Sequence, residues 1–208
     1  MTPTLKQMIQ SATLLSLFTL SGILLLLWVY TLTQPKIEQA HQQTLINTFQ
    51  QIIPSHKYDN DPLTDTLILN SPEATQLLGT PPPITLYRLR KNHQAVGLIL
   101  PIVAPDGYSG NIHLLVGIYK DGTLAGVRVL QHRETPGLGD KIELKKSPWI
   151  KSFNGRSLQN PPLEQWAVKK DHGIFDQFTG ATITPRAVVK AVKNALIFVN
   201  QMGDRLYD

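Results

Sequence analysis

The hydrophobic pattern begins with a long apolar run that no charged side chain interrupts. Residues 12–32 are uncharged, and about 20 apolar residues, rising about 1.5 Å each, cover a bilayer core of about 30 Å. Trp28 and Tyr30 stand near the end of the run, and aromatic rings with a polar group prefer the membrane interface. A cleaved signal peptide would have a shorter apolar core and small residues at its cleavage site. The run therefore predicts an uncleaved transmembrane helix over 12–32, preceded by a short tail of residues 1–11.

The next segment, residues 35–53, mixes apolar and polar residues instead of being apolar throughout. Its apolar residues recur at helical spacing until Pro54, and they are Ile37, Ala40, Leu45, Phe49 and Ile52. This spacing predicts an amphipathic helix that connects the membrane to a domain. We expect its apolar face to pack on that domain, with contact to partner membrane subunits as the alternative.

Residues 54–208 combine strand-like and helix-like patterns. Apolar and β-branched runs predict strands over 84–90, 94–103, 113–119 and 124–130. Asp121-Gly122 joins the last two runs and is typical of a hairpin turn. Helical patterns occur after Ser71, around 146–153 and after Pro185. We therefore expect one α+β domain over 54–208, with a mostly antiparallel sheet flanked by helices.

Composition narrows the chemistry. The chain has no cysteine, which excludes disulfides, thiolate metal sites and iron–sulfur ligation within it, so a redox role would need an organic cofactor. The net charge is +5, but the densest basic cluster lacks the interleaved aromatic residues of a nucleic-acid platform; it comprises Lys141, Lys145, Lys146 and Lys151. We interpret the cluster as a solvated face and expect no nucleic-acid partner.

The segment DQFTGATIT, residues 176–184, gathers three threonines around one glycine. Thr184 precedes Pro185 and is predicted to cap the last helix. This capping role leaves two threonines, Thr179 and Thr182, whose hydroxyls have no assigned role. They are either loop residues that bond to nearby backbone or groups with a chemical role, because a helix N-terminus suits a phosphate and a hydroxyl can carry one as an ester.

A second segment, HRETPGLGDKI over 132–142, follows the last predicted strand. Its proline and glycines make either an ordinary turn or a backbone surface for a planar ligand, and their spacing fits no nucleotide fingerprint. His132 and Glu134 are weak metal-ligand candidates without a third partner, so no metal site is expected. A hydrolase built from His172, Asp176 and Thr182 is a further alternative that no nucleophile motif supports.

Taken together, these motifs resemble one family. DQFTGAT (176–182) resembles the flavinylation motif D-x-x-[ST]-G-A-[ST], and ETPGLG (134–139) resembles the other signature of the same FMN-binding domain. GYSG at 107–110 and the strands after it fit the same pattern. With its N-terminal anchor, the chain is similar to the G subunits of Rnf/Rsx ion-translocating electron transport complexes, and to the C subunits of sodium-pumping NADH:quinone oxidoreductases.

The resemblance implies a covalent cofactor. A separate flavin transferase, using FAD and Mg²⁺, would attach FMN through its phosphate to Thr182. The same match gives recognition and positioning roles to Asp176, Thr179, Gly180 and Ala181. It places along the flavin the residues Glu134, Thr135, Pro136, Gly137, Leu138 and Gly139. Tyr108, Lys141 and Lys169 are further candidates for ring contact by position.

The resemblance also implies a place and a role. The chain would cross a bacterial inner membrane once, with residues 1–11 cytoplasmic and the C-terminal domain periplasmic, an orientation that its charges alone do not determine. It would relay electrons between the subunits of a larger complex, with no catalytic residue of its own. The alternative is a cofactor-free, membrane-anchored binding or assembly module in which Thr182 is an ordinary loop residue.

Overall fold

The computed structural model describes residues 3–207 and begins with one long helix. Helix α1 runs from Pro3 to Ile52, so it joins the predicted segment 12–32 to all but the last residue of the predicted segment 35–53. Pro35 lies inside it; proline removes one helical hydrogen bond, and the helix continues on both sides. Residues 1 and 2 of the predicted tail lie outside the described residues. Among the described helices, α1 alone is long and apolar enough to cross a membrane.

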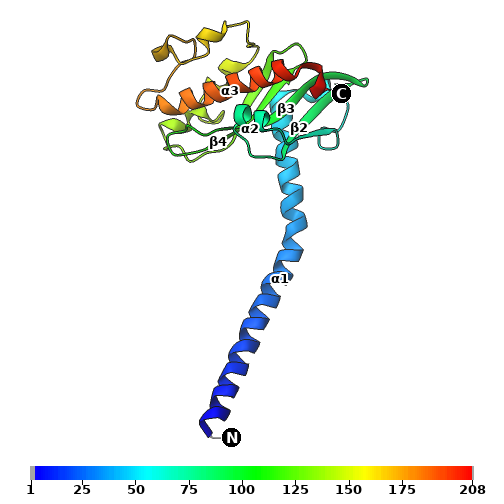
Figure 1. Ribbon diagram of the computed structural model, residues 1–208, viewed down its shortest axis with the longest axis vertical. Helices are drawn as coiled ribbons and strands as arrows, with labels where there is room; N and C mark the ends of the chain where they lie inside the picture. The colour runs from blue at the N-terminus through cyan, green and yellow to red at the C-terminus, as the bar shows by residue number, and fades with distance from the viewer. Residues whose placement is uncertain (1–2, 208) are drawn as a thin grey trace. The chain divides into compact units, whose positions relative to one another are not determined.

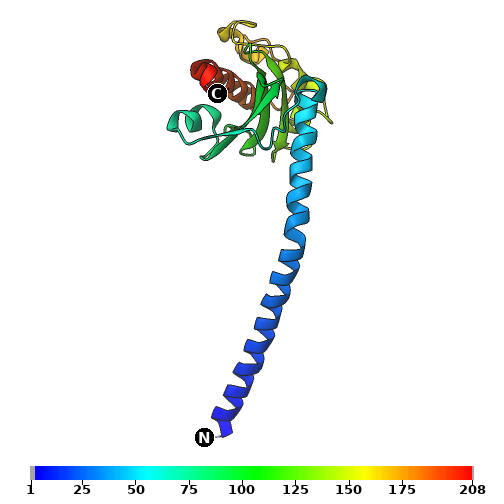
Figure 2. The ribbon, with the colours of Figure 1, turned by 90° about the vertical axis from the view of Figure 1, so that its right-hand side faces the viewer.

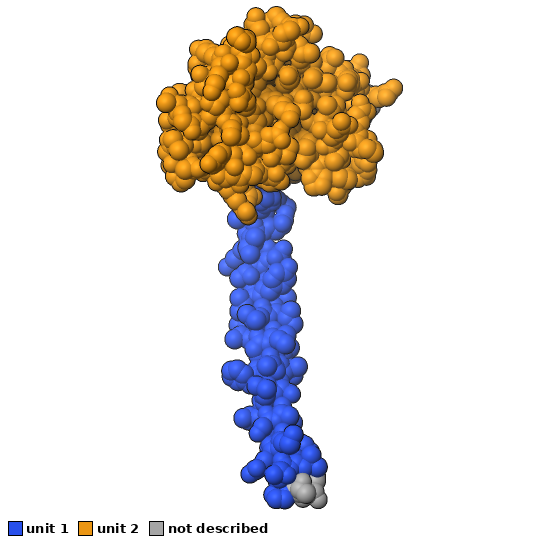
Figure 3. Space-filling model, turned by 60° about the vertical axis from the view of Figure 1, so that its left-hand side comes forward, with its two compact units in different colours: residues 1–47 blue, residues 48–208 orange. Residues whose placement is uncertain are grey.

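The chain divides into two compact units, residues 1–47 and 48–208 (Figure 3). The first unit is the body of α1, and from residue 3 onward its side chains are exposed except for Leu45 and Ile46, which are half-buried. The second unit contains the last turn of α1 and all the other elements. Its first residue precedes the predicted domain start at 54 by six positions.

A five-stranded antiparallel sheet forms the centre of the second unit (Figure 1). Its strands lie side by side in sequence order: β1 (Thr66–Leu69), β2 (Ile84–Lys91), β3 (Gln94–Ala104), β4 (Ile112–Tyr119) and β5 (Leu124–Gln131). The predicted antiparallel sheet and its four predicted strands are confirmed. Strand β1 was not predicted, because four residues are too short a run to show a period of two.

Two helices cover one face of this sheet (Figure 2). In α2 (Pro72–Leu78) the side chain of Ser71 accepts a hydrogen bond from the Ala74 N–H, as the sequence predicts. Helix α3 (Ile183–Met202) presents its apolar stripe to the sheet and buries eleven residues. The remaining helices are short 3₁₀ segments: η1 (Ser55–Lys57), η2 (Gly139–Ile142), η3 (Pro148–Phe153), η4 (Leu163–Gln165), η5 (Lys169–Asp171) and η6 (Gly203–Leu206).

The main core lies between the sheet and α3. Leu98, Val116 and Val192 are fully buried in it, and burying such a side chain contributes about 1.5–3 kcal/mol. At one end of this core a set of aromatic rings supports the loops around the start of α3. They are Trp149, Phe153, Trp166, Phe175 and Phe178.

The opposite face of the sheet receives the last turn of α1. Gly117 and Gly126 are cross-strand partners in β4 and β5, and Ile52 lies over both glycines. A Cβ on Gly117 would stand only 2.3 Å from the Ile52 Cγ2, so a side chain there would displace the helix end. The buried Arg128 donates from Nη2 to the Gln51 carbonyl at 2.7 Å, which satisfies an unpaired C=O group at the helix C-terminus.

Candidate functional site

A cavity of about 580 Å³ lies where α3 begins, and both sequence motifs line it. Its walls are Tyr108, Glu134, Thr135, Leu138, Gly139, Lys170 and residues 180–184. The β3–β4 loop, the segment after β5 and the start of α3 each contribute. The fold thus brings together three segments that are distant in sequence.

Thr182 lies between a tight turn and the first residue of α3. The Ala181 N–H donates to the Phe178 carbonyl at 3.0 Å, and Gly180 has a φ of +81°, where a side chain would be strained. Thr182 occupies the N-cap position, is half-buried and makes no capping hydrogen bond. Within the described chain its hydroxyl is therefore uncommitted and lines the cavity.

The predicted cap at Thr184 is wrong. Helix α3 begins at Ile183, so Thr184 and Pro185 lie inside its first turn. The Thr184 side chain is fully buried and donates to Oε2 of Glu134. Local sequence preference favours a Thr-Pro cap, but the tertiary partner Glu134 draws the hydroxyl away from that role.

Glu134 is a buried carboxylate with two partners from different segments. Its Oε1 accepts from the Ser109 N–H at 2.9 Å, and its Oε2 accepts from the Thr184 hydroxyl. A Cβ on Gly139 would stand 2.8 Å from the Thr184 Oγ1 and 2.9 Å from the Glu134 Cβ. A glycine is therefore needed at position 139, because a side chain there would collide with Thr184 and Glu134.

The rest of the ETPGLG segment is a turn at the cavity edge. The Thr135 carbonyl accepts from the N–H groups of Leu138 and Gly139, both at 3.1 Å. Thr135 and Leu138 line the cavity, whereas Pro136 and Gly137 are exposed and are not among its lining residues. The exposed side chain of Leu138 makes part of this wall apolar.

The first half of the DQFTGAT segment lies outside the cavity lining. Asp176 is exposed and pairs with Lys169 at 2.6 Å, and its carbonyl accepts from the Trp149 indole at 2.7 Å. Thr179 is exposed in the turn. Both residues are therefore accessible from solvent, as a recognition element would be.

Sequence reasoning missed one basic residue. Lys170 lines the cavity, whereas its neighbour Lys169 is paired with Asp176. Tyr108 lines the cavity as proposed, and Lys141 is not among the lining residues. The dipeptide Lys169-Lys170 carried a signal, but the turn of η5 determines which of the two faces the cavity.

His132 and His172, the histidines considered as metal ligands or catalytic bases, do not line the cavity. His132 accepts from the Glu134 N–H through Nδ1 at 3.0 Å, so its proton is on Nε2, 2.8 Å from Oε1 of Glu143. Neither His132 nor His172 is among the residues that line the cavity with Thr182. Among the described residues no group of three His, Cys, Asp or Glu side chains is placed to hold a metal.

Positive potential gathers where α3 begins. The first N–H groups of a helix have no partner within it, and in α3 these belong to Ile183 and Thr184, because Pro185 has none. Arg186 donates to Asp171 from two nitrogens, and the hydrogen bond from Arg186 lowers the pKa of the Asp171 carboxyl. With Lys170 on the wall, the Thr182 hydroxyl is set in surroundings that favour an anion.

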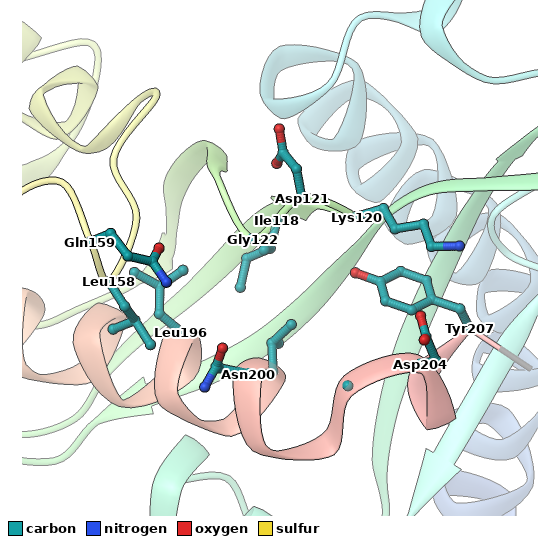
Figure 4. A pocket seen from close by; sticks show the side chains of 12 residues that line it. Ile118, Lys120, Asp121, Gly122, Leu158, Gln159, Leu196, Asn200, Asp204 and Tyr207 are labelled. Carbon is teal, nitrogen blue, oxygen red and sulfur yellow. The ribbon is translucent and has the colours of Figure 1, made fainter.

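A smaller cavity of about 200 Å³ lies at the other end of α3 (Figure 4). Asn200, Gln159 and Asp204 surround it, and Tyr207 borders it. The Tyr207 hydroxyl is buried without a hydrogen-bond partner in the described chain. Its pKa is raised to about 12, by burial first and then by Asp121 and Asp204.

Comparison with known proteins agrees with the two motifs. The FMN-binding domain family matches residues 107–197, and the RnfG N-terminal region matches residues 1–52. The G subunit of the ion-translocating oxidoreductase complex from Pseudomonas aeruginosa strain UCBPP-PA14 is 47% identical over 203 residues, which are 98% of this chain and 94% of that protein. Proteins of the same name are 45% identical in Vibrio cholerae strain O395, over 94% of this chain and 91% of that protein, and 43% identical in Aliivibrio fischeri, over 97% and 95%.

Proposed function

Since this chain belongs to the family of G subunits of ion-translocating oxidoreductase complexes, we propose that it carries FMN on Thr182 and relays electrons between neighbouring subunits. The observation that carries the proposal is the Thr182 hydroxyl. It is half-buried, makes no capping hydrogen bond within the described chain, and lines a cavity built from both motifs. The neighbouring Thr184 hydroxyl is committed to Glu134.

The residues of the cavity fit a flavin mononucleotide. Ligand pockets have volumes of about 300–1,000 Å³, and this one has about 580 Å³. Leu138, Ala181 and Ile183 offer apolar surface to a planar ring. The free N–H groups of Ile183 and Thr184, with Lys170, would hold the phosphate.

Attachment needs an outside enzyme. In the proposed step, an Mg²⁺-dependent flavin transferase breaks the phosphoanhydride of FAD, the Thr182 Oγ1–phosphorus bond forms, and AMP leaves with the bridging oxygen. The hydroxyl proton passes to solvent or to a base of the transferase. Asp176 and Thr179, both exposed, would be read by that enzyme.

Once attached, the flavin supplies reversible electron uptake and release. The chain's own task is to tether the phosphate at Thr182 and to present the ring at an open edge beside Tyr108 and Leu138, both exposed. We propose that α1 crosses the bacterial inner membrane with the C-terminal domain in the periplasm. The partners are then the lipid bilayer, the other subunits of the complex and, during maturation, the transferase.

The test is flavin attachment to the full chain. The protein is expressed with its transferase, denatured, and examined by intact mass and in-gel flavin fluorescence. Wild type and Thr182→Ser, which keeps a hydroxyl, should gain the mass of one FMN less one water. Thr182→Val, which has nearly the same shape without the hydroxyl, should not.

The cofactor-free alternative makes the opposite prediction. An assembly module would show no mass increase in any of the three proteins. A wild-type chain that stays unmodified beside an active transferase contradicts the proposed cofactor. Flavin that persists on Thr182→Val contradicts the proposed site.

A further inference from the structure

The Glu134 carboxylate connects two walls of the cavity, the β3–β4 loop and the start of α3. One oxygen holds the Ser109 amide in the β3–β4 loop, and the other holds the Thr184 hydroxyl in the first turn of α3. The side chain is 4% exposed. A buried carboxylate needs such donors, and bonds from neutral donors to a charged acceptor are stronger than neutral ones.

Two glycines shape the space around this carboxylate. A Cβ on Gly107 would stand 3.0 Å from Oε1, and a Cβ on Gly139 would stand 3.0 Å from Oε2. The backbone of the GYSG segment and the backbone of the ETPGLG segment thus approach the carboxylate from either side. Both donors and both glycines serve the same two oxygens.

The same contact lies two residues from the attachment point. Thr184 is fixed by Glu134, and Thr182 precedes it at the N-cap of α3. The segment after β5 is itself held in place, because the Glu134 N–H donates to His132 and His132 contacts Glu143. Glu134 therefore fixes the position of the start of α3 relative to the sheet.

We propose that Glu134 is a positioning residue of the flavin site, which acts through Ser109 and Thr184 and does not hold the flavin itself. It sets the distance between the β3–β4 loop and the start of α3, so that the Thr182 hydroxyl faces the cavity. This inference rests on the proposed attachment of FMN to Thr182. It differs from the expectation that Glu134 lies along the flavin as a direct contact, although Glu134 also lines the cavity.

Four variants separate positioning from chemistry. Glu134→Ala removes both acceptors. Glu134→Gln keeps an oxygen for the Ser109 N–H and offers its amide to the Thr184 oxygen, which can accept. Thr184→Val removes the hydrogen bond from the Thr184 hydroxyl to Glu134. The matched control is Asp65→Ala, because Asp65 is also a carboxylate that joins two segments, through Arg88 and Arg90 of β2 and through Asn60.

The first measurement is hydrogen exchange on the full chain in detergent, made without the transferase. We expect Glu134→Ala to speed exchange in peptides over 107–110 and 181–186 by about tenfold or more, the factor for a lost bond to a charged group. Glu134→Gln should remain near wild type. Asp65→Ala should speed exchange over 59–69 and 88–92 and leave the two cavity segments unchanged.

The second measurement is the rate of flavin attachment by the transferase. We expect the rate to fall about tenfold in Glu134→Ala, to fall less in Thr184→Val, and to return in Glu134→Gln. Unchanged exchange over 107–110 and 181–186 in Glu134→Ala would overturn the inference. So would a Gln variant with normal exchange but the slow attachment of the Ala variant, because the charge itself would then act on the flavin.

The two proposals fail in distinguishable ways. A wild-type chain that takes no flavin contradicts the proposed function, and positioning of the flavin site by Glu134 falls with it. A wild-type chain that takes flavin at the same rate as Glu134→Ala contradicts the positioning role alone.

Discussion

The hydroxyl groups of residues 176–184 show how far single residues can be interpreted from sequence. Counting from the helix start, a Thr-Pro pair predicts a cap at Thr184, yet the structure gives this hydroxyl to Glu134, fifty residues away. The N-cap position belongs to Thr182. Capping preference is a local property, and no local pattern encodes a partner contributed by another segment.

At the same scale, Tyr207 provides a test of stability. Its hydroxyl is buried without a partner in the described chain, and such a group costs about 1–3 kcal/mol of desolvation. Tyr207→Phe should therefore raise the free energy of unfolding by about 1 kcal/mol at pH 7. Urea denaturation followed by tryptophan fluorescence measures the change, and Tyr119→Phe is the control, because Tyr119 is only half-buried. A loss of stability in Tyr207→Phe would contradict an unpaired hydroxyl.

Tyr207 also predicts an alkaline dependence. Burial, Asp121 and Asp204 raise its pKa to about 12, whereas in the unfolded chain the pKa is about 10. The unfolded state thus releases its proton first, so the raised pKa has no effect on stability below about pH 10 and lowers the stability as the pH rises toward 12. Unfolding measured between pH 9 and 11.5 should show a shallower decline in Tyr207→Phe than in wild type. Parallel declines would contradict the raised pKa.

At the scale of elements, β1 is held to the sheet by charge as well as by pairing. Asp65 precedes β1 and pairs with Arg88 and Arg90 of β2 at 2.7 and 2.8 Å. Burial acts to raise its pKa, but the hydrogen bonds and charges of the two arginines outweigh it, and the pKa is lowered. This arrangement explains how a four-residue strand is fixed in a register that its own sequence does not specify.

Acid should weaken this contact in a defined direction. Because the folded pKa of Asp65 lies below its unfolded value of about 3.9, its contribution is present above about pH 4 and lost as the pH falls through the folded pKa. Asp65→Asn should be less stable than wild type by roughly 1 kcal/mol at pH 7, and the difference should shrink toward pH 2. Denaturant titrations at both pH values measure it, and a difference independent of pH would contradict the linkage.

The last turn of α1 is a second element whose place depends on one side chain. Arg128 satisfies the Gln51 carbonyl, and burial lowers the pKa of its guanidinium. Arg128→Met keeps an apolar stem but leaves the carbonyl unpaired, so we expect a loss of about 1–3 kcal/mol and faster hydrogen exchange over residues 49–53. Arg156→Met is the control, because Arg156 makes one long bond at a more accessible position. Equal effects of the two variants would contradict a docking role for Arg128.

At the scale of the molecule, the boundary of the second unit decides what can fold without the anchor. Phe49, Ile52 and Ile53 are buried in the second unit, and residues 3–47 add no buried side chain to the core. A fragment of residues 48–208 should therefore keep the thermal midpoint of the full chain to within a few degrees. A fragment of residues 54–208 loses three buried side chains, roughly 5–9 kcal/mol by their burial, which is comparable with the whole stability of a domain.

Both fragments can be compared by near-ultraviolet circular dichroism and calorimetry. A cooperative transition for 48–208 and none for 54–208 is the expected pair of results. A fragment of residues 54–208 that unfolds cooperatively near the midpoint of 48–208 would show that the last turn of α1 is dispensable.

The sequence predicts the architecture well because its signals are local. Runs of β-branched residues, an Asp-Gly turn and a 3.6-residue apolar stripe each predict one element, and the sheet follows the order of the chain. The cavity is harder to predict. Lys170 rather than Lys169 lines it, and Glu134 turns toward Ser109 and Thr184; both facts depend on how loops pack, which no periodicity records.

The order of the elements along the chain determines when the proposed attachment of the flavin could occur. The sheet is complete at Gln131, but α3, which contributes to the cavity wall and buries eleven residues, comes near the end of the chain. A nascent chain that still lacks α3 has the Thr182 hydroxyl without the wall that orients it. With the proposed attachment at Thr182, flavin transfer would therefore follow synthesis rather than accompany it, and a chain that ends within α3 would remain without flavin.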